Sequence, residues 1–305
     1  MYIPPLNLHD VWDVKPIQTQ NYKFHLEYIA TVHPKKVYDT GHLFVGSLNN
    51  PCLSITFNLP GIRTINDRLA DVDLSVASLN KLKNIKECIL ETSNTTKSSF
   101  SKEMLNAVMD EIRHSFTFIR YLKLHDTSYI PCDGDYDTLD LLFYNIALHK
   151  KTWYEQTFNA YFIPRDDYIK YKCAIEKYAS PETKEFYTWK RFYTDVLSTV
   201  NAYAKSVLRA HSDNIEVMYE SAKTFPDFFI ALSNFIPRSD KCKFFKDWLE
   251  IFLKNDMKIQ NERTWYIDLY PLENPRISGG RRNRVTRRKK LRHRRQSTCN
   301  TASAN

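Results

Sequence analysis

The dominant hydrophobic period of this 305-residue chain changes near residues 125–137. Before this point apolar side chains alternate: Tyr22, Phe24, Leu26 and Tyr28 share one face of residues 22–32, which is typical of a strand. After it they recur three and four residues apart, as in amphipathic helices. The pattern therefore predicts an α+β fold, with a β-containing N-terminal half and a mostly α-helical C-terminal half.

Breaks in the hydrophobic pattern and the distribution of charge divide the chain further, into four predicted regions. The regions are an extended arm at 1–20, an α+β region at 21–130, a helical region at 131–275 and a disordered basic tail at 276–305. Three prolines and the lack of a period indicate the arm. Whether the two halves are separate domains stays open at this stage.

Six segments of the chain have the alternation or composition of strands. These are residues 22–32, 42–47, 52–59, 86–92, 115–124 and 264–270. In the segment 115–124 we expect Phe116 and Phe118 to point inward. Residues 101–114 predict a helix capped by Ser101, and the ambiguous segment 65–85 favours helix because its apolar residues lie three and four apart.

The C-terminal half contains five further predicted helices. They span residues 138–149, 166–178, 181 to about 209, 226–235 and 239–254. Asp137 and Ser239 are the expected caps of the first and the last. Ser180 followed by Pro181 is a start signal, because proline suits the first helical position.

Positive charge is concentrated at one end of the chain. The formal net charge is +9, yet residues 281–295 alone hold ten basic residues and no acidic one, which leaves 34 basic against 35 acidic residues elsewhere. The predicted polyanion-binding residues are Arg281, Arg282, Arg284, Arg287, Arg288, Lys289, Lys290, Arg292, Arg294 and Arg295. Such a segment buries too little apolar surface to fold alone, so we expect a disordered arm that attracts polyanions.

Composition excludes several classes of function. Only six glycines are present and neither GxGxxG nor GxxxxGK[ST] occurs, which excludes nucleotide cofactors bound by such loops. No run approaches the ~18 apolar residues of a membrane span, and no secretory signal opens the chain. The six cysteines form no CxxC pair, and their irregular spacing predicts reduced thiols in a cytosolic chain.

Two groups of residues could form a metal site or a catalytic pair. For both, we favour the interpretation without such a function. Asp133, Asp135 and Asp137 alternate like ligands of a calcium loop, but the rest of that loop is missing, so we predict a solvated turn and no metal. A Cys132 nucleophile with His125 or His149 is conceivable. The sequence does not orient such a pair, and we predict no catalytic residue and no cofactor.

Residues 149–162 (HKKTWYEQTFNAYF) form the most distinctive patch before the tail. Trp153, Tyr154 and Phe158 follow a basic triplet, and basic residues beside aromatic ones can bind single-stranded nucleic acid by stacking. Packing of these rings on the core is the favoured alternative. The same two interpretations apply to a cluster at residues 184–193, where helical spacing again favours core packing.

Two resemblances follow from these residues. The segments 124–132 and 139–162, together with a Gly-Gly/Arg-rich tail, resemble uncharacterised proteins of nucleocytoplasmic large DNA viruses. This resemblance implies a viral origin and brings no established active site. More weakly, the WYxxxFxA step resembles the Tyr-containing helix of GCN5-related acetyltransferases, which implies Tyr154 near an active site. The pyrophosphate loop of that family is absent, so the resemblance implies a degenerate relative.

The combined expectation is a non-enzymatic viral protein, virion-associated or accessory, whose basic tail binds nucleic acid or another polyanion without sequence specificity. Docking to a capsid or a membrane surface is a further use of the tail. The expected location is the host cytoplasm or the virion, with the host nucleus open through the tail. The alternative is an acyltransferase-like enzyme, or a degenerate relative, with Tyr154 near its active site.

Overall fold

The computed structural model describes residues 12–19, 22–31, 39–47, 50–59, 75–82, 91–92, 100–132, 138–197, 200–259 and 263–271. These residues form two compact units. The first unit holds the described residues up to His125 together with 264–271, and the second holds those from Asp126 to Arg263. The α+β prediction is confirmed, because the sheet lies in the N-terminal half and the C-terminal half is helical.

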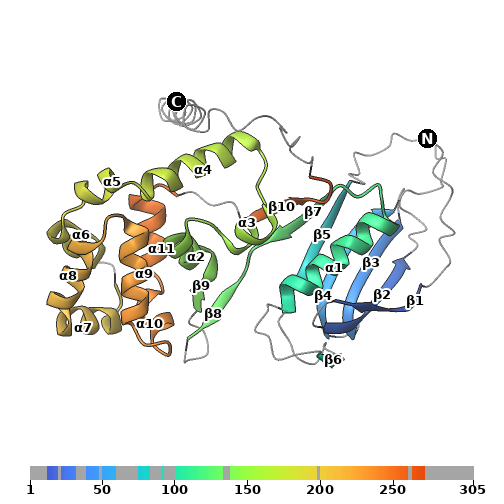
Figure 1. The fold of residues 1–305 in the computed structure, drawn as a ribbon, viewed down its shortest axis with the longest axis horizontal. Helices are drawn as coiled ribbons and strands as arrows, with labels where there is room; N and C mark the ends of the chain where they lie inside the picture. Colours follow the sequence, from blue (N-terminus) through green and yellow to red (C-terminus); the bar gives the residue numbers. More distant parts are fainter. Residues whose placement is uncertain are drawn as a thin grey trace, which may run out of the picture. The chain divides into compact units, whose positions relative to one another are not determined.

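A single sheet dominates the first unit. Its hydrogen-bonded order is β1-β2-β3-β4-β5-β7-β10, and β6 pairs with β2 off this path. The strands are β1 (Trp12–Gln18), β2 (Tyr22–Thr31), β3 (Asp39–Ser47), β4 (Asn50–Leu59), β5 (Val76–Leu82), β6 (Glu91–Thr92), β7 (Tyr121–His125) and β10 (Thr264–Asp268). Figure 1 shows helix α1 (Phe100–Ser115) running across this sheet.

Only one pairing among the described strands of this sheet is parallel. Strands β5 and β7 run in the same direction, whereas all other described neighbours are antiparallel. A parallel pair needs a crossover connection, and α1 lies between these two strands in the chain. Strand β10 pairs with the other side of β7, so a segment that starts 139 residues after His125 completes the sheet.

The core of the first unit lies between α1 and one face of the sheet. Alternate residues of β2, Phe24, Leu26 and Tyr28, are buried there, as their spacing predicts. The apolar face of α1 is buried as well, including Leu105 and Ile112. A glycine is required at position 41, because a Cβ there would lie 2.5 Å from the Phe57 ring.

Three predictions for this unit are wrong in part. Residues 12–18 of the predicted arm are strand β1, because pairing with β2 stabilises a segment that has no period of its own. Within the predicted helix 65–85, residues 76–82 are strand β5, since β4 and β7 flank them. The segment 115–124 becomes a strand only at Tyr121, and Phe116 is buried just after α1 ends.

The second unit consists of a small hairpin and a set of short helices. Strands β8 (Tyr129–Pro131) and β9 (Thr138–Asp140) pair antiparallel. The helices are α2 (Leu141–His149), α3 (Trp153–Phe158), α4 (Arg165–Tyr178), α5 (Pro181–Phe186), α6 (Trp189–Leu197), α7 (Ala202–Ala210), α8 (Ser212–Ser221), α9 (Phe225–Phe235), α10 (Lys241–Phe245) and α11 (Trp248–Ile251), with a π-helical turn at Phe252–Asp256.

Aromatic rings fill the core of this unit. Phe228 lies with its ring centroid 4.9 Å from that of Tyr219 and 5.5 Å from that of Phe192, in edge-to-face arrangements that aromatic pairs prefer. Phe225 and Phe252 pack 5.2 Å apart in the same cluster. The predicted core packing of the aromatic residues at 184–193 is confirmed for Tyr187, Trp189 and Phe192, all of which are buried.

Helix ends account for most corrections in this unit. The cap of α2 is Asp140, because residues 138–140 pair with β8 as strand β9, and Asp137 lies outside the described residues. Ser180 caps α5 as predicted, but that helix ends at Phe186 instead of continuing to Arg209. Ser239 caps no helix, and the chain from 239 to 254 is divided at Lys246 and Asp247. Ser101 lies inside α1.

The prediction of reduced cysteines is wrong. Cys132 and Cys242 form a disulfide across 110 residues, joining the end of β8 to α10. Cys52 and Cys173 each take part in a disulfide as well, and no described cysteine is free. Irregular spacing along the chain does not reveal which thiols meet in space, so the sequence could not exclude these bonds.

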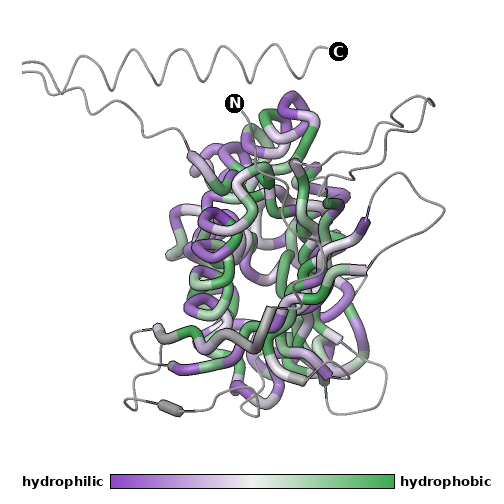
Figure 2. Tube along the Cα trace, turned by 90° about the vertical axis from the view of Figure 1, so that its right-hand side faces the viewer, coloured by the Kyte–Doolittle hydropathy of each residue, from purple (hydrophilic) through white to green (hydrophobic). Residues whose placement is uncertain are grey.

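Hydrophilic (purple) and hydrophobic (green) stretches alternate along the coloured trace in Figure 2. Among the described residues, no helix combines the length and the apolar character that a membrane crossing requires. The predicted helical region of residues 131–275 also differs from the structure at its end. Residues 264–271 return to the sheet of the first unit as strand β10 and the segment that follows it.

Candidate functional site

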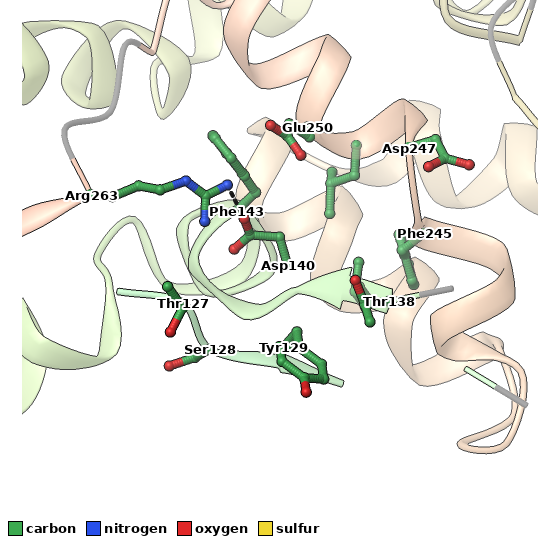
Figure 3. A pocket seen from close by; sticks show the side chains of 12 residues that line it. Thr127, Ser128, Tyr129, Thr138, Asp140, Phe143, Phe245, Asp247, Glu250 and Arg263 are labelled. Carbon is green, nitrogen blue, oxygen red and sulfur yellow. Dashed lines mark hydrogen bonds and ion pairs between the residues drawn. The ribbon is translucent and has the colours of Figure 1, made fainter. Parts of the chain in front are cut away.

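A cleft of about 420 Å³ opens in the second unit beside the start of α2. We call it the Asp140 cleft and define it by Ser128, Tyr129, Asp140, Glu250 and Arg263, which line it with their neighbours. Figure 3 shows that the hairpin side provides Thr127, Ser128 and Tyr129, while Asp247 and Glu250 come from the facing helical wall.

Arg263 and Asp140 connect two distant segments at this cleft. The Arg263 guanidinium donates to Asp140 Oδ2 at 2.7 Å, drawn as a dashed line in Figure 3. The other carboxylate oxygen of Asp140 accepts the Leu142 N–H at 2.9 Å, which is the N-cap bond of α2. One carboxylate therefore both begins α2 and holds the arginine that precedes β10.

Asp126 lies buried beside this pair, with only 3% of its surface exposed. Its backbone N–H donates to the Arg263 carbonyl at 2.7 Å, and its Oδ1 accepts the Ser128 N–H at 3.0 Å. Burial raises the pKa of the Asp126 carboxyl, and the nearby negative charge of Asp140 raises it further. The hydrogen bonds from Ser128 and the charge of Arg263 oppose that shift in pKa.

The helical wall adds two more carboxylates. Glu250 forms an ion pair with Lys254 four residues later, as is common on helix surfaces. Asp247 has a positive φ of 67° between α10 and α11 and makes no ion pair with any described residue. A non-glycine residue at positive φ is strained, and the surrounding fold has to hold it there.

The three residues of the predicted aromatic patch lie together on α3, and Tyr154 interacts with Ser128 of the cleft lining. The Trp153 ring packs edge-on against Tyr154 and Phe158, with centroids 4.9 and 5.4 Å apart. Tyr154 is buried, whereas Trp153 and Phe158 are half-buried. Burial and the charge of Asp126 raise the pKa of the Tyr154 hydroxyl, while a hydrogen bond with Ser128 opposes this. Tyr154 is not among the residues that line the Asp140 cleft.

The local sequence explains why α3 begins at Trp153 and why it is fixed in position. Thr152 and Glu155 form a reciprocal capping box at its start. The buried Glu155 carboxylate also accepts from Tyr171 at 2.7 Å and Tyr168 at 3.2 Å, and pairs with Lys172 at 3.3 Å. These contacts bind α3 to α4 and give Glu155 a structural role.

The lining of the Asp140 cleft can accept hydrogen bonds and attract positive charge. It contains carboxylates and hydroxyls, and no histidine or cysteine lies among the residues that line it. Within the described part of the chain, no three His, Cys, Asp or Glu side chains are grouped so that they could hold a metal ion. A carboxyl group of raised pKa beside a cleft is a feature often found at functional sites, and Asp126 is such a group here.

Other predicted residues fare differently. The ten basic residues from Arg281 to Arg295 lie outside the described part of the chain, as do Asp133, Asp135 and Asp137. The Cys132 nucleophile is wrong, because the disulfide with Cys242 leaves no thiolate to attack a substrate.

Sequence reasoning missed Asp126, Asp140 and Arg263. Arg263 is 123 residues from Asp140 and has no local signal of that pairing. An Asp directly before the apolar run of α2 was the available sign for Asp140, because Asp is a preferred N-cap residue.

These features define an α+β protein of two units whose helical unit carries a carboxylate-lined cleft. In comparisons with known proteins, no protein-family model, no curated protein and no solved structure matches the chain.

Proposed function

We propose that the chain is a non-enzymatic protein of a large DNA virus, virion-associated or accessory, whose basic tail binds nucleic acid or another polyanion. The observation that carries this proposal is the segment 281–295, with ten basic residues and no acidic one. Lysine and arginine side chains bind phosphates by releasing condensed counterions, and this requires no base contact. The binding is therefore weakly sequence-specific and sensitive to salt.

The disulfides support the virion as the setting. Such bonds persist in oxidising environments, which include virion surfaces, whereas cytosolic thiols are kept reduced. All four described cysteines are disulfide-bonded. Of the locations that the sequence suggests, host cytoplasm, host nucleus and virion, the virion fits this chemistry best. There the tail would also be available to dock on a capsid or an anionic membrane surface.

Salt-dependent DNA binding tests the tail directly. We compare the full chain with a variant that ends at Ser278, measuring the affinity for duplex DNA over a range of salt concentrations. The matched control ends at Arg295 and loses only the polar residues 296–305. Full engagement of ten cations gives a log–log slope of about −9 on duplex DNA. We expect a steep slope for the full chain and the control, and a shallow slope after Ser278. Equal affinity and slope for all three would contradict the proposal.

The acyltransferase-like alternative is the weaker proposal. Its candidate residue, Tyr154, is buried, and burial raises the pKa of its hydroxyl, which makes proton donation harder. A thermal-shift titration with acetyl-CoA distinguishes the two proposals. A ligand that binds the folded chain raises its melting temperature in proportion to the logarithm of ligand concentration. A rise that follows this logarithmic dependence would favour the enzyme, and the absence of a shift at high concentration would count against it.

A further inference from the structure

A second cleft, of about 540 Å³, lies in the second unit between α5 and the end of α8. We call it the Lys184 cleft. Lys184 and Glu185 contribute to it from α5, and Tyr219 and Glu220 from α8. Tyr187 and Lys223 complete the part of the lining used below. This cleft shares no lining residue with the Asp140 cleft, and it is independent of the function proposed for the tail.

Lys184 is an unusual lysine, because it is only 6% exposed. Its Nζ lies 3.5 Å from the centroid of the Tyr219 ring, and it makes no hydrogen bond or ion pair with any described residue. Two other lysines of this unit have polar partners: Lys172 pairs with Glu155, and Lys241 donates to Ser233 at 3.1 Å. Buried cations are almost always paired, so Lys184 is an exception that calls for a chemical explanation.

The position of the Lys184 amine is well determined by its surroundings. The Tyr219 hydroxyl donates to the Tyr187 carbonyl at 2.6 Å, which fixes the ring beneath Nζ. The same ring packs against Phe192 and Phe228 in the aromatic core, with centroids 5.1 and 4.9 Å away. Burial lowers the pKa of Lys184, and the negative charge of Glu220 offsets part of this shift. The fraction of molecules in which the amine is unprotonated near neutral pH is therefore larger for Lys184 than for an exposed lysine.

The other charges of the cleft indicate which ligand suits it. Glu185 and Glu220 line it together with Lys184 and Lys223, so the four groups sum to zero when Lys184 is protonated and to −1 when it is a free amine. The two carboxylates repel a strongly anionic ligand. The rings of Tyr187 and Tyr219 supply apolar surface for a neutral one. A small uncharged molecule with one electrophilic centre fits this combination.

We propose that the Lys184 cleft binds a small aldehyde or ketone and that Lys184 forms an imine with it. The free amine attacks the carbonyl carbon, the carbonyl oxygen takes up a proton, and the nitrogen loses one, which gives a carbinolamine. Loss of its hydroxyl group as water and of the second amine proton gives the imine, with no change of oxidation state. Glu185 and Glu220 are the carboxylates in the cleft that can carry these protons.

Reductive trapping tests the proposal on the full chain. The protein is incubated near pH 7 with salicylaldehyde, a neutral aromatic aldehyde, and with cyanoborohydride, which reduces imines to stable amines. Peptide mass spectrometry then measures the labelling rate of each lysine. We expect Lys184 to be labelled several-fold faster than Lys223, which lines the same cleft but is exposed. An equal or lower rate at Lys184 would overturn the proposal, and this comparison needs no variant.

Two variants and a second probe sharpen the test. Lys184→Arg keeps the positive charge over the Tyr219 ring but has no amine that can form an imine, so the fast labelling should disappear. Lys223→Arg is the matched control and should leave it unchanged. Pyridoxal 5′-phosphate, an anionic aldehyde, should label Lys184 more slowly than salicylaldehyde. Fast labelling that persists in Lys184→Arg would overturn the proposal, and so would a preference of Lys184 for the anionic probe.

Discussion

Asp126 places an ionisable carboxyl where water barely reaches, and this has a consequence for stability that depends on pH. Its pKa in the folded chain is raised, chiefly by burial. The folded chain therefore keeps this proton at a pH where the unfolded chain, with an ordinary aspartate pKa of about 3.9, has lost it. The free energy of unfolding contributed by this group falls as the pH rises through that window, and the cost is fully present above it.

We predict that Asp126→Asn stabilises the protein at neutral pH and has little effect near pH 3.5. The amide oxygen of the introduced asparagine can still accept the Ser128 N–H, while the buried negative charge is gone. Urea unfolding of both proteins between pH 3.5 and 7 measures the difference. A difference that stays constant over this range would contradict the assignment of the cost to ionisation. Asp110→Asn, at an exposed position of α1, serves as the control.

The buried Glu155 carboxylate has hydrogen-bond partners on both of its oxygens. Removing one partner should therefore lower the free energy of unfolding. Tyr171 is 2% exposed and donates to Glu155 Oε2 at 2.7 Å. We predict that Tyr171→Phe lowers the free energy of unfolding by about 1.5–3 kcal/mol, the usual range for a hydrogen bond to a charged group. Tyr168→Phe is the matched control, because its bond is longer, 3.2 Å, and less buried. Equal losses in both variants, measured by urea unfolding, would contradict this ranking.

The sequence predicts correctly which residues are buried where an element packs only one of its faces against a core. The alternation of Phe24, Leu26 and Tyr28 is confirmed, because a strand against a core buries every second side chain. The Asp140–Arg263 pair could not be predicted, since neither residue has a local signal for a partner 123 positions away. The same holds for Lys184, whose spacing within α5 resembles that of a solvated lysine.

Among the elements, the hairpin β8–β9 and α10 are joined by the Cys132–Cys242 disulfide. The bond closes a loop with a sequence separation of 110 residues, which restricts the unfolded chain strongly. We predict that Cys132→Ser combined with Cys242→Ser lowers the free energy of unfolding by about 2–5 kcal/mol in oxidising buffer.

The experiment has a built-in control in the redox state of the buffer. With a strong reductant the bond is broken in the parent chain as well, so the difference between parent and double variant should shrink. Chemical denaturation followed by tryptophan fluorescence measures both conditions. A difference that persists under reduction would assign the loss to the serine side chains instead of the cross-link.

Element boundaries were predictable where caps and periods agree. Ser180 before Pro181 marks the start of α5 correctly, and α4 and α9 begin within a residue of their predicted starts. The end of α5 at Phe186 was missed, because no glycine or proline interrupts the segment that follows. Strand β5 was missed because the parallel partner that stabilises it, β7, lies beyond a helix.

At the scale of the whole molecule, each unit has its own buried core. The aromatic cluster of the second unit and the α1–sheet core of the first are built from different residues. A domain with a core of its own can unfold as a cooperative unit. The chain order hides this division, because strand β10 belongs to the first unit although it follows all the described helices of the second.

We therefore predict two calorimetric unfolding transitions that respond separately to a matched pair of substitutions. Leu269 in the first unit and Leu249 in the second are each 1% exposed. Replacing either by alanine removes the same atoms and costs about 2.7–5 kcal/mol in the unit that contains it. Leu269→Ala should lower the midpoint of one transition and Leu249→Ala that of the other. If a single transition moved equally with both variants, the two cores would unfold as one, and β10 would then couple the whole chain through its pairing with β7.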